Sequence, residues 1–195
     1  MNQEIITTSS GDTLRKKENF QMLPGKTLVI GPSRAGKSFY SEAFKVAGLA
    51  VLDVDKDTTL IKWRDDITGE PVLKPQGANT TWLNGHHFTI KPKELTDFLS
   101  GQGDVIMFAH CWNIMDIVDL FDRVAYMELS PDELDRRLKL ERSDHTAVGS
   151  PDELEFFRKR HQVRSEQARQ HNITFIDATL TPNEFYNELS QVQAK

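Results

Sequence analysis

Five short apolar segments recur along the chain, and they alternate with segments whose apolar residues have helical spacing. The apolar segments are Thr27–Ile30, Leu49–Val54, Val105–Ala109, Val124–Leu129 and Ile173–Asp177. Short strands that alternate with helices are typical of a parallel sheet covered by helices on both faces. Because the crossover connections of such sheets are right-handed, the pattern predicts a wound, three-layer α/β/α fold.

Capping signals mark the starts of three predicted helices. In each case a serine or threonine stands three residues before a glutamate, which is the spacing of a capping box. The pairs are Ser130 with Glu133, Ser150 with Glu153, and Thr181 with Glu184. The first predicted helix covers Ser38–Ala47 and ends at Gly48, a residue type that suits a helix C-terminus. Two shorter helices are expected at Asp57–Arg64 and Lys93–Ser100.

The sequence divides into a polar N-terminal extension and one domain. The extension, residues 1–25, is expected to be a tail or a short hairpin, and residues 26–195 then form the domain. Glycine and proline interrupt Thr68–Lys91, which predicts an irregular substrate insertion at about residues 65–91. A loop that could act as a lid is predicted at about residues 142–151.

Composition narrows the class of protein further. The 195 residues are enough for one α/β domain with a buried core. The net charge of −5 gives no broad basic field, so nucleic acid is not an expected partner. Cys111 is the single cysteine, which indicates a reducing, cytoplasmic location. No secretory signal and no membrane-spanning apolar run is present, so we expect no membrane association and a monomer or homodimer.

Residues 31–38 match the Walker A phosphate-binding pattern G-x-x-x-x-G-K-[ST] at every fixed position. The match lies between an apolar strand and a helix, where backbone N–H groups and the helix N-terminus can surround phosphate oxygens. Lys37 would reach the β- and γ-phosphates of ATP, and the Ser38 hydroxyl would bind Mg²⁺. The residues predicted to bind the nucleotide are Gly31, Ser33, Arg34, Ala35, Gly36, Lys37, Ser38 and Phe39.

Several classes of P-loop protein do not fit. The sequence has no N-K-x-D motif, which reads guanine in GTPases. The D-x-x-G match at Asp66–Gly69 lies in the stretch predicted to be irregular, and we interpret it as chance. The strand Val105–Ala109 does not end in an acidic residue, where many ATPases place an aspartate that organises Mg²⁺. These absences argue against a GTPase and against a motor ATPase.

Two aspartates stand at the end of the second predicted strand. The C-terminal ends of parallel strands line the ligand crevice, and side chains two residues apart share a strand face. Asp53 and Asp55 are therefore expected beside the phosphate loop, with both carboxylates directed alike. Asp53 would organise the water shell of Mg²⁺, and Asp55 would orient and deprotonate an acceptor hydroxyl. Aspartate is also common in solvated turns, which leaves a structural role open.

This succession of motifs resembles a known family. A phosphate loop, a D-x-D strand end and an arginine-rich helix before a loop resemble the shikimate- and gluconate-kinase branch of the adenylate-kinase-like P-loop kinases. Other segments resemble small kinase-like ATPases: Phe108–Asn113, Leu120–Val124, Leu134–Leu138 and Ile176–Thr179. The resemblance covers roughly residues 26–192 and implies a P-loop NTPase fold with a five-stranded parallel sheet of order 2-3-1-4-5.

The chain departs from that family at two places. Shikimate kinases carry a glycine triplet after the third strand, where this chain has His110-Cys111-Trp112-Asn113. They also carry a substrate-binding arginine after the D-x-D helix, and Thr68–Lys91 offers no clear equivalent. Shikimate is therefore not the expected acceptor. Adenylate kinases have a different substrate loop after the second strand, so AMP is not favoured either.

Arginines are concentrated on the two helices that flank the predicted lid. Phosphoryl transfer spreads negative charge over oxygens that arginine can stabilise, and a closing lid excludes water. By resemblance, Arg137 and Arg142 would contact phosphates, with Arg137 also in the nucleotide-binding set, and Arg160 would bind the acceptor. Such residues also form ordinary solvated helix faces, so each single role stays open. His110 is a candidate acceptor contact or a packed histidine.

The leading hypothesis is an ATP-dependent phosphotransferase, a kinase that moves the γ-phosphate of Mg-ATP to a hydroxyl or phosphate of a small molecule. One alternative is a nucleoside or nucleotide kinase, in which Trp82, Asn84 and Phe88 could hold a base. A second alternative is a P-loop regulatory module that binds ATP with little transfer activity, which the missing acid on the third strand supports. The sequence does not identify the acceptor.

Overall fold

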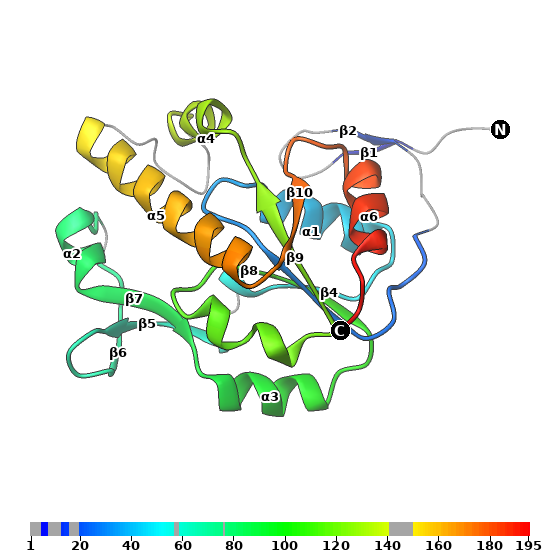
Figure 1. Ribbon diagram of the computed structural model, residues 1–195, viewed down its shortest axis with the longest axis horizontal. Coiled ribbons are helices and arrows are strands. Elements are labelled where there is room, and N and C mark those ends of the chain that lie inside the picture. The colour runs from blue at the N-terminus through cyan, green and yellow to red at the C-terminus, as the bar shows by residue number, and fades with distance from the viewer. Residues whose placement is uncertain (1–4, 8–12, 16–19, 57–58, 76, 141–149) are drawn as a thin grey trace.

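The computed structural model describes residues 5–7, 13–15, 20–56, 59–75, 77–140 and 150–195 (Figure 1). At the N-terminus, β1 (Ile5–Thr7) and β2 (Thr13–Arg15) pair antiparallel, which is the hairpin form of the expected extension. The rest of the described chain is built around a central sheet.

Five parallel strands make the central sheet. They are β3 (Lys26–Ile30), β4 (Val51–Asp53), β8 (Val105–Ala109), β9 (Arg123–Glu128) and β10 (Thr174–Asp177). Neighbours follow the order β4-β8-β3-β9-β10, and every pair is parallel. Counted within this sheet alone, that order reads 2-3-1-4-5. The whole-chain numbers differ because a hairpin and a second sheet supply the other strands. The predicted fold class is confirmed.

Helices cover both faces of this sheet. They are α1 (Lys37–Val46), α3 (Pro92–Ser100), α4 (Pro131–Leu138), α5 (Pro151–Gln170) and α6 (Pro182–Gln191), with short 3₁₀ turns η1 (Val54–Lys56), η2 (Ile114–Asp116) and η3 (Val118–Leu120). Leu28 and Ile30 of β3 pack in a cluster with residues of α3 and α5, whereas Val29 packs with residues of α1 and α6. Since strand side chains alternate between faces, β3 is buried from both sides.

A second, smaller sheet replaces the irregular insertion that the sequence predicted. It is antiparallel in the order β6-β5-β7, with β5 (Ile61–Asp65), β6 (Pro71–Val72) and β7 (His86–Ile90), and α2 (Thr80–Asn84) precedes β7. In Figure 1 it lies beside the central sheet, on the side away from α6. The helix predicted at Asp57–Arg64 is also wrong, because Ile61 and Trp63 alternate with polar residues and pair with Ile90 and Phe88 across the sheet.

The predicted capping boxes form at two of three helices. Ser150 with Glu153 and Thr181 with Glu184 make both reciprocal bonds. At α4, Ser130 accepts the bond from the Glu133 N–H group, but the Glu133 side chain pairs with arginines of its own helix instead. The third box is therefore only half formed. Among the described residues, no helix is long and apolar enough to cross a membrane.

Candidate active site

The phosphate loop lies between β3 and α1, and its backbone needs glycine. Gly36, the residue before α1, has a left-handed φ of 102°. A Cβ atom on Gly31 would lie 2.8 Å from Met127 Sδ and 2.9 Å from Lys37 Cγ. No side chain among the described residues caps α1, whereas α4, α5 and α6 are each capped by a hydroxyl. The first-turn N–H groups of α1 therefore lack intrahelical partners and suit phosphate oxygens.

Lys37 is buried and folds back over the loop. Its Nζ donates to the carbonyl oxygens of Gly31 at 2.8 Å and Pro32 at 2.9 Å. The same nitrogen lies 3.2 Å from Asp55 Oδ2. The ammonium group is thus held at the mouth of the loop by three oxygen atoms, which a bound phosphate oxygen could replace.

Ser38 and Asp53 meet beside the loop. Ser38 Oγ donates to Asp53 Oδ2 at 2.8 Å, and Asp53 is buried. Asp53 Oδ1 is also buried and has no hydrogen-bond partner among the described residues. A buried oxygen without a partner is costly, and Mg²⁺ prefers hydroxyl, carboxylate and water oxygens. The pair therefore fits Mg²⁺ or a water bound to it.

Asp55 does not lie on the strand, so the predicted shared strand face is wrong. β4 ends at Asp53, and Asp55 follows in the 3₁₀ turn η1. The turn nevertheless brings the carboxylate to the loop: Oδ2 faces Lys37, and Oδ1 accepts a bond of 2.9 Å from the His110 N–H group. Burial raises the pKa of Asp55, although Lys37 and the His110 N–H group oppose this shift. A raised pKa makes the carboxylate a better proton acceptor.

His110 follows β8 and stands next to this carboxylate. Burial holds the pKa of His110 well below its usual value, and the charge of Lys37 adds to the effect. The imidazole is therefore neutral at physiological pH. Its Nδ1 is buried and has no hydrogen-bond partner among the residues that the structure describes. A neutral ring with one unsatisfied nitrogen suits contact with a polar group of the phosphoryl acceptor. The predicted role of His110 as an acceptor contact stays a prediction.

Arg137 reaches the phosphate loop from α4. Its Nη1 donates to the carbonyl oxygen of Ala35 at 2.9 Å, and its Nη2 donates to that of Ala178 at 3.0 Å. Glu133 accepts a bond from its Nε, which explains why this carboxylate leaves the helix cap. Arg137 thus joins the loop to the segment after β10. Arg142, its predicted companion, lies outside the described residues, as does most of the predicted lid.

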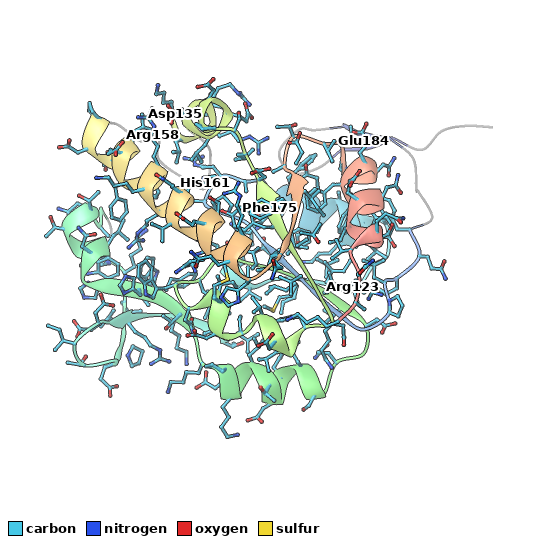
Figure 2. All side chains as sticks on the ribbon, viewed as in Figure 1. Arg123, Asp135, Arg158, His161, Phe175 and Glu184 are labelled. Carbon is cyan, nitrogen blue, oxygen red and sulfur yellow. The ribbon has the colours of Figure 1, made fainter. Side chains whose placement is uncertain are left out.

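Arg160 contacts α2 and Trp112 and not the phosphate loop. Its Nη2 donates to the Leu83 carbonyl oxygen at 2.8 Å, and its guanidinium lies over the rings of Phe156, at 4.4 Å, and Trp112, at 5.4 Å. Figure 2 shows a different arrangement for Arg158 on the same helix, which pairs with Asp135 of α4. The acceptor role of Arg160 stays a prediction.

The aromatic residues of the small sheet pack mainly on one another. Trp82 stacks on His86 with ring centroids 4.2 Å apart, and Trp63 stacks on Phe88 at 5.1 Å. These contacts occupy ring faces that a bound base would need. The arrangement is that of a local core, and it weakens the case for base recognition by Trp82 and Phe88.

Phe39 and Cys111 are the remaining residues named from the sequence. Phe39 lies on α1, partly buried, with its ring centroid 5.3 Å from that of Tyr40, and it packs against the core. Its predicted part in nucleotide binding is not tested by this packing. Cys111 is fully buried, and burial raises the pKa of its thiol to about 12. It is a small apolar residue of the core.

Comparison with known proteins identifies the fold. No family model matches the sequence, and no curated protein matches it. A shikimate kinase from Bacteroides thetaiotaomicron has a TM-score of 0.51 at 13% identity, covering 87% of this chain and 96% of that chain. A gluconokinase from Sinorhizobium meliloti 1021 scores 0.47 at 16% identity, covering 87% and 91%, and a shikimate kinase from Aquifex aeolicus vf5 scores 0.48 at 14%, covering 84% and 92%.

At such low identity, a similarity of this kind concerns the fold alone. The chain has the three-layer P-loop fold of a shikimate kinase, as the sequence resemblance predicted.

Proposed function

We propose that this protein is an Mg-ATP-dependent phosphotransferase that acts on a small molecule. One observation carries the proposal: the two chemistry-bearing residues of the phosphate loop each meet a carboxylate. Lys37 Nζ lies 3.2 Å from Asp55, and Ser38 Oγ lies 2.8 Å from Asp53. Phosphoryl transfer needs one acid near the metal and one near the attacking group, and the similarity of the fold to kinases supports this interpretation.

The residues divide the work. Lys37, Ser38 and the N-terminus of α1 would hold the phosphates of ATP, and Asp53 would hold Mg²⁺ or its water shell. Bound Mg²⁺ would neutralise charge on the phosphates. Asp55 would accept the proton of the acceptor hydroxyl while the acceptor oxygen bonds to the γ-phosphorus and the bond from phosphorus to the leaving ADP oxygen breaks. His110 and Arg160 would contact the acceptor.

The finer assignments belong to the same proposal. The acceptor group is a hydroxyl or a phosphate of a small molecule, and Arg137 and Arg142 stabilise the charge that develops during transfer. The protein would work in the cytoplasm, as a monomer or homodimer, without nucleic acid or membrane partners. A nucleoside acceptor is the first alternative, and a regulatory module that binds ATP without transfer is the second.

An acceptor screen tests the proposal. Purified protein with Mg-ATP is incubated with hydroxy acids, sugars, polyols, nucleosides and nucleotides, and ADP release and phosphorylated products are measured. We expect one chemical class to raise ADP release, and the Lys37→Ala variant to abolish that increase. Tight ATP binding with no acceptor-dependent ADP release across the panel would favour the regulatory module, and a nucleoside product would select the first alternative.

A further inference from the structure

Arg164 of α5 is a buried arginine, and two of its three hydrogen bonds to described residues go to backbone carbonyl oxygens. It is 7% exposed, and its Nη2 donates to the carbonyl oxygens of Cys111 at 3.2 Å and Trp112 at 2.7 Å. Its Nη1 donates to the Gln167 side chain at 2.9 Å. Among the described residues, no carboxylate lies at ion-pair distance from it, whereas Arg169, on the same helix, pairs with Glu128.

A buried cation is costly unless its hydrogen bonds are satisfied. In Arg164 these bonds converge on two successive carbonyl groups, so the guanidinium fixes the path of one short segment. The arrangement differs from a surface ion pair, in which a flexible side chain meets another flexible side chain. It indicates that the backbone at residues 111 and 112 has to be held in one position.

The segment held in this way is His110–Asn113, which joins β8 to η2. On its other side it is bound to β7, because the Trp112 N–H group donates to the Phe88 carbonyl oxygen at 2.7 Å. The Asn113 side chain donates to the Ile90 carbonyl oxygen at 2.7 Å and accepts from the Ile90 N–H group at 3.0 Å. The segment is therefore clamped between α5 and the small sheet.

This segment also carries the N–H group that holds the proposed base. His110 N donates to Asp55 Oδ1 at 2.9 Å, while Asp55 Oδ2 stays directed to Lys37 at 3.2 Å. The charge of Asp53 from β4 also raises the pKa of Asp55, and the charge of Asp55 in turn raises the pKa of Cys111 from the same segment. The direction of the carboxylate thus depends on the direction of one peptide N–H group.

We propose that Arg164 is a positioning residue for Asp55, acting through the clamped segment His110–Asn113. The inference rests on the proposed function, in which Asp55 accepts the proton of the acceptor. With the carbonyl groups of Cys111 and Trp112 fixed, the preceding N–H group of His110 keeps its direction and its bond to Asp55 Oδ1, so Asp55 Oδ2 stays directed to Lys37 and the phosphate loop. The hydrogen bonds of Arg164 go to Cys111, Trp112 and Gln167, none of which belongs to the phosphate loop.

Kinetic measurements on matched variants test this role. Arg164→Gln should lower kcat by about 10–100-fold, because small misplacements of a reacting group cost that much, with the KM for ATP nearly unchanged. Arg164→Lys keeps the buried charge but loses the planar guanidinium, so its kcat should lie between those of Arg164→Gln and the wild type. If Arg164→Gln fails to fold, Arg164→Lys replaces it in every measurement. Arg169→Gln is the control and should leave kcat unchanged.

A double-variant cycle separates positioning from general damage. If Arg164 acts through Asp55, then adding Arg164→Gln to Asp55→Asn should cause little further loss of kcat. Independent losses that multiply would overturn the proposal. Equal losses of kcat in Arg164→Gln and Arg169→Gln would overturn it as well.

A spectroscopic measurement does not depend on finding the acceptor. The amide signal of His110 should lie downfield in the wild-type protein, because a bond to a charged carboxylate is short and strong. It should move upfield in both Asp55→Asn and Arg164→Gln, while the amide signal of Met107 in β8 stays in place. An unmoved His110 signal in folded Arg164→Gln would overturn the positioning role. Conversely, a moved signal with no acceptor-dependent activity in the wild type would count against the proposed function alone.

Discussion

The phosphate end, meaning the loop at residues 31–38 together with Asp53 and Asp55, is stabilised by other interactions than the small sheet. At the phosphate end, short-range geometry constrains each residue. Gly36 has a left-handed φ, and a Cβ atom on Gly31 would displace the side chains of Met127 and Lys37. Carboxylates face Lys37 and Ser38. In the small sheet, stacked rings and strand pairing create the structure.

The contrast separates two kinds of specificity. In the proposed function, the first region would recognise phosphate with backbone groups, so almost any ligand that carries a triphosphate would satisfy it. The second region is held together by its own side chains, because Trp63 stacks on Phe88 and Trp82 stacks on His86. The two regions meet across the segment His110–Asn113. Its His110 N–H group bonds to Asp55, where the acceptor would react, and its Trp112 N–H group bonds to Phe88 of β7.

The largest effect is expected at that meeting point. Asp55→Asn should lower acceptor phosphorylation by about 10²–10⁴-fold, because general-base assistance is lost. ATP affinity should be retained, since Lys37 keeps its two loop carbonyl partners until ATP binds. Acceptor-dependent ADP release and the Kd of Mg-ATP are measured side by side, with the exposed Asp97→Asn on α3 as control. Undiminished transfer in Asp55→Asn would remove the distinction between the two regions.

A second prediction concerns the phosphate end alone. Lys37→Ala should lower turnover by about 10²–10³-fold, comparable to losing one donor that stabilises transition-state charge, and should also weaken ATP binding. The fold should persist, because the Lys37 side chain bonds to loop carbonyl oxygens and belongs to neither apolar core cluster. Lys45→Ala, at the exposed end of the same helix, is the matched control. Normal ATP affinity in folded Lys37→Ala would contradict the assignment of the loop.

Asp53 offers a third, smaller effect that separates the metal from the base. Asp53→Asn should raise the Mg²⁺ concentration needed for half-maximal activity by about 10–100-fold, the usual cost of altering an outer partner of a metal. At saturating Mg²⁺ most of the turnover should return, which Asp55→Asn cannot achieve. Activity is titrated with Mg²⁺ at fixed ATP, with the exposed Asp119→Asn as control. An unchanged Mg²⁺ requirement would place Asp53 outside the metal site.

The two regions also differ in how far the sequence predicts them. The five strands of the central sheet were predicted from their apolar runs, because a strand that is buried on both faces consists almost entirely of apolar residues. The phosphate loop was predicted because its motif fixes residue types at fixed positions, and Gly36 takes the left-handed φ that favours glycine. Asp53 and Asp55 both lie near the loop, as predicted, but they do not share a strand face. The chain changes direction at η1, within two residues of Asp53.

The small sheet was not predicted, because its local sequence signal is weak. Trp63 and Ile61 alternate with Lys62 and Arg64, but the glycines and prolines that follow gave a stronger turn signal. The pairing of β5 with β7 joins residues more than twenty positions apart, and local propensity carries no information on contacts at that separation. The clamp made by Arg164 was equally invisible, because an arginine that bonds backbone carbonyls needs no partner at a fixed spacing in the sequence.

The smallest effect on ATP binding is expected when the small sheet itself is weakened. Trp63 stacks on Phe88 and lies 5.0 Å from the ring of Trp82. Trp63→Ala should lower the free energy of unfolding by about 1–3 kcal/mol, because two aromatic contacts and part of the buried ring area are lost. ATP affinity should not change, since the phosphate loop makes no use of this ring. Ile67→Ala, 95% exposed in the same sheet's hairpin, should alter neither quantity. Urea unfolding and ATP titration measure the two. If ATP affinity falls together with stability, the two regions fold and bind as one unit, and the contrast drawn between them does not hold.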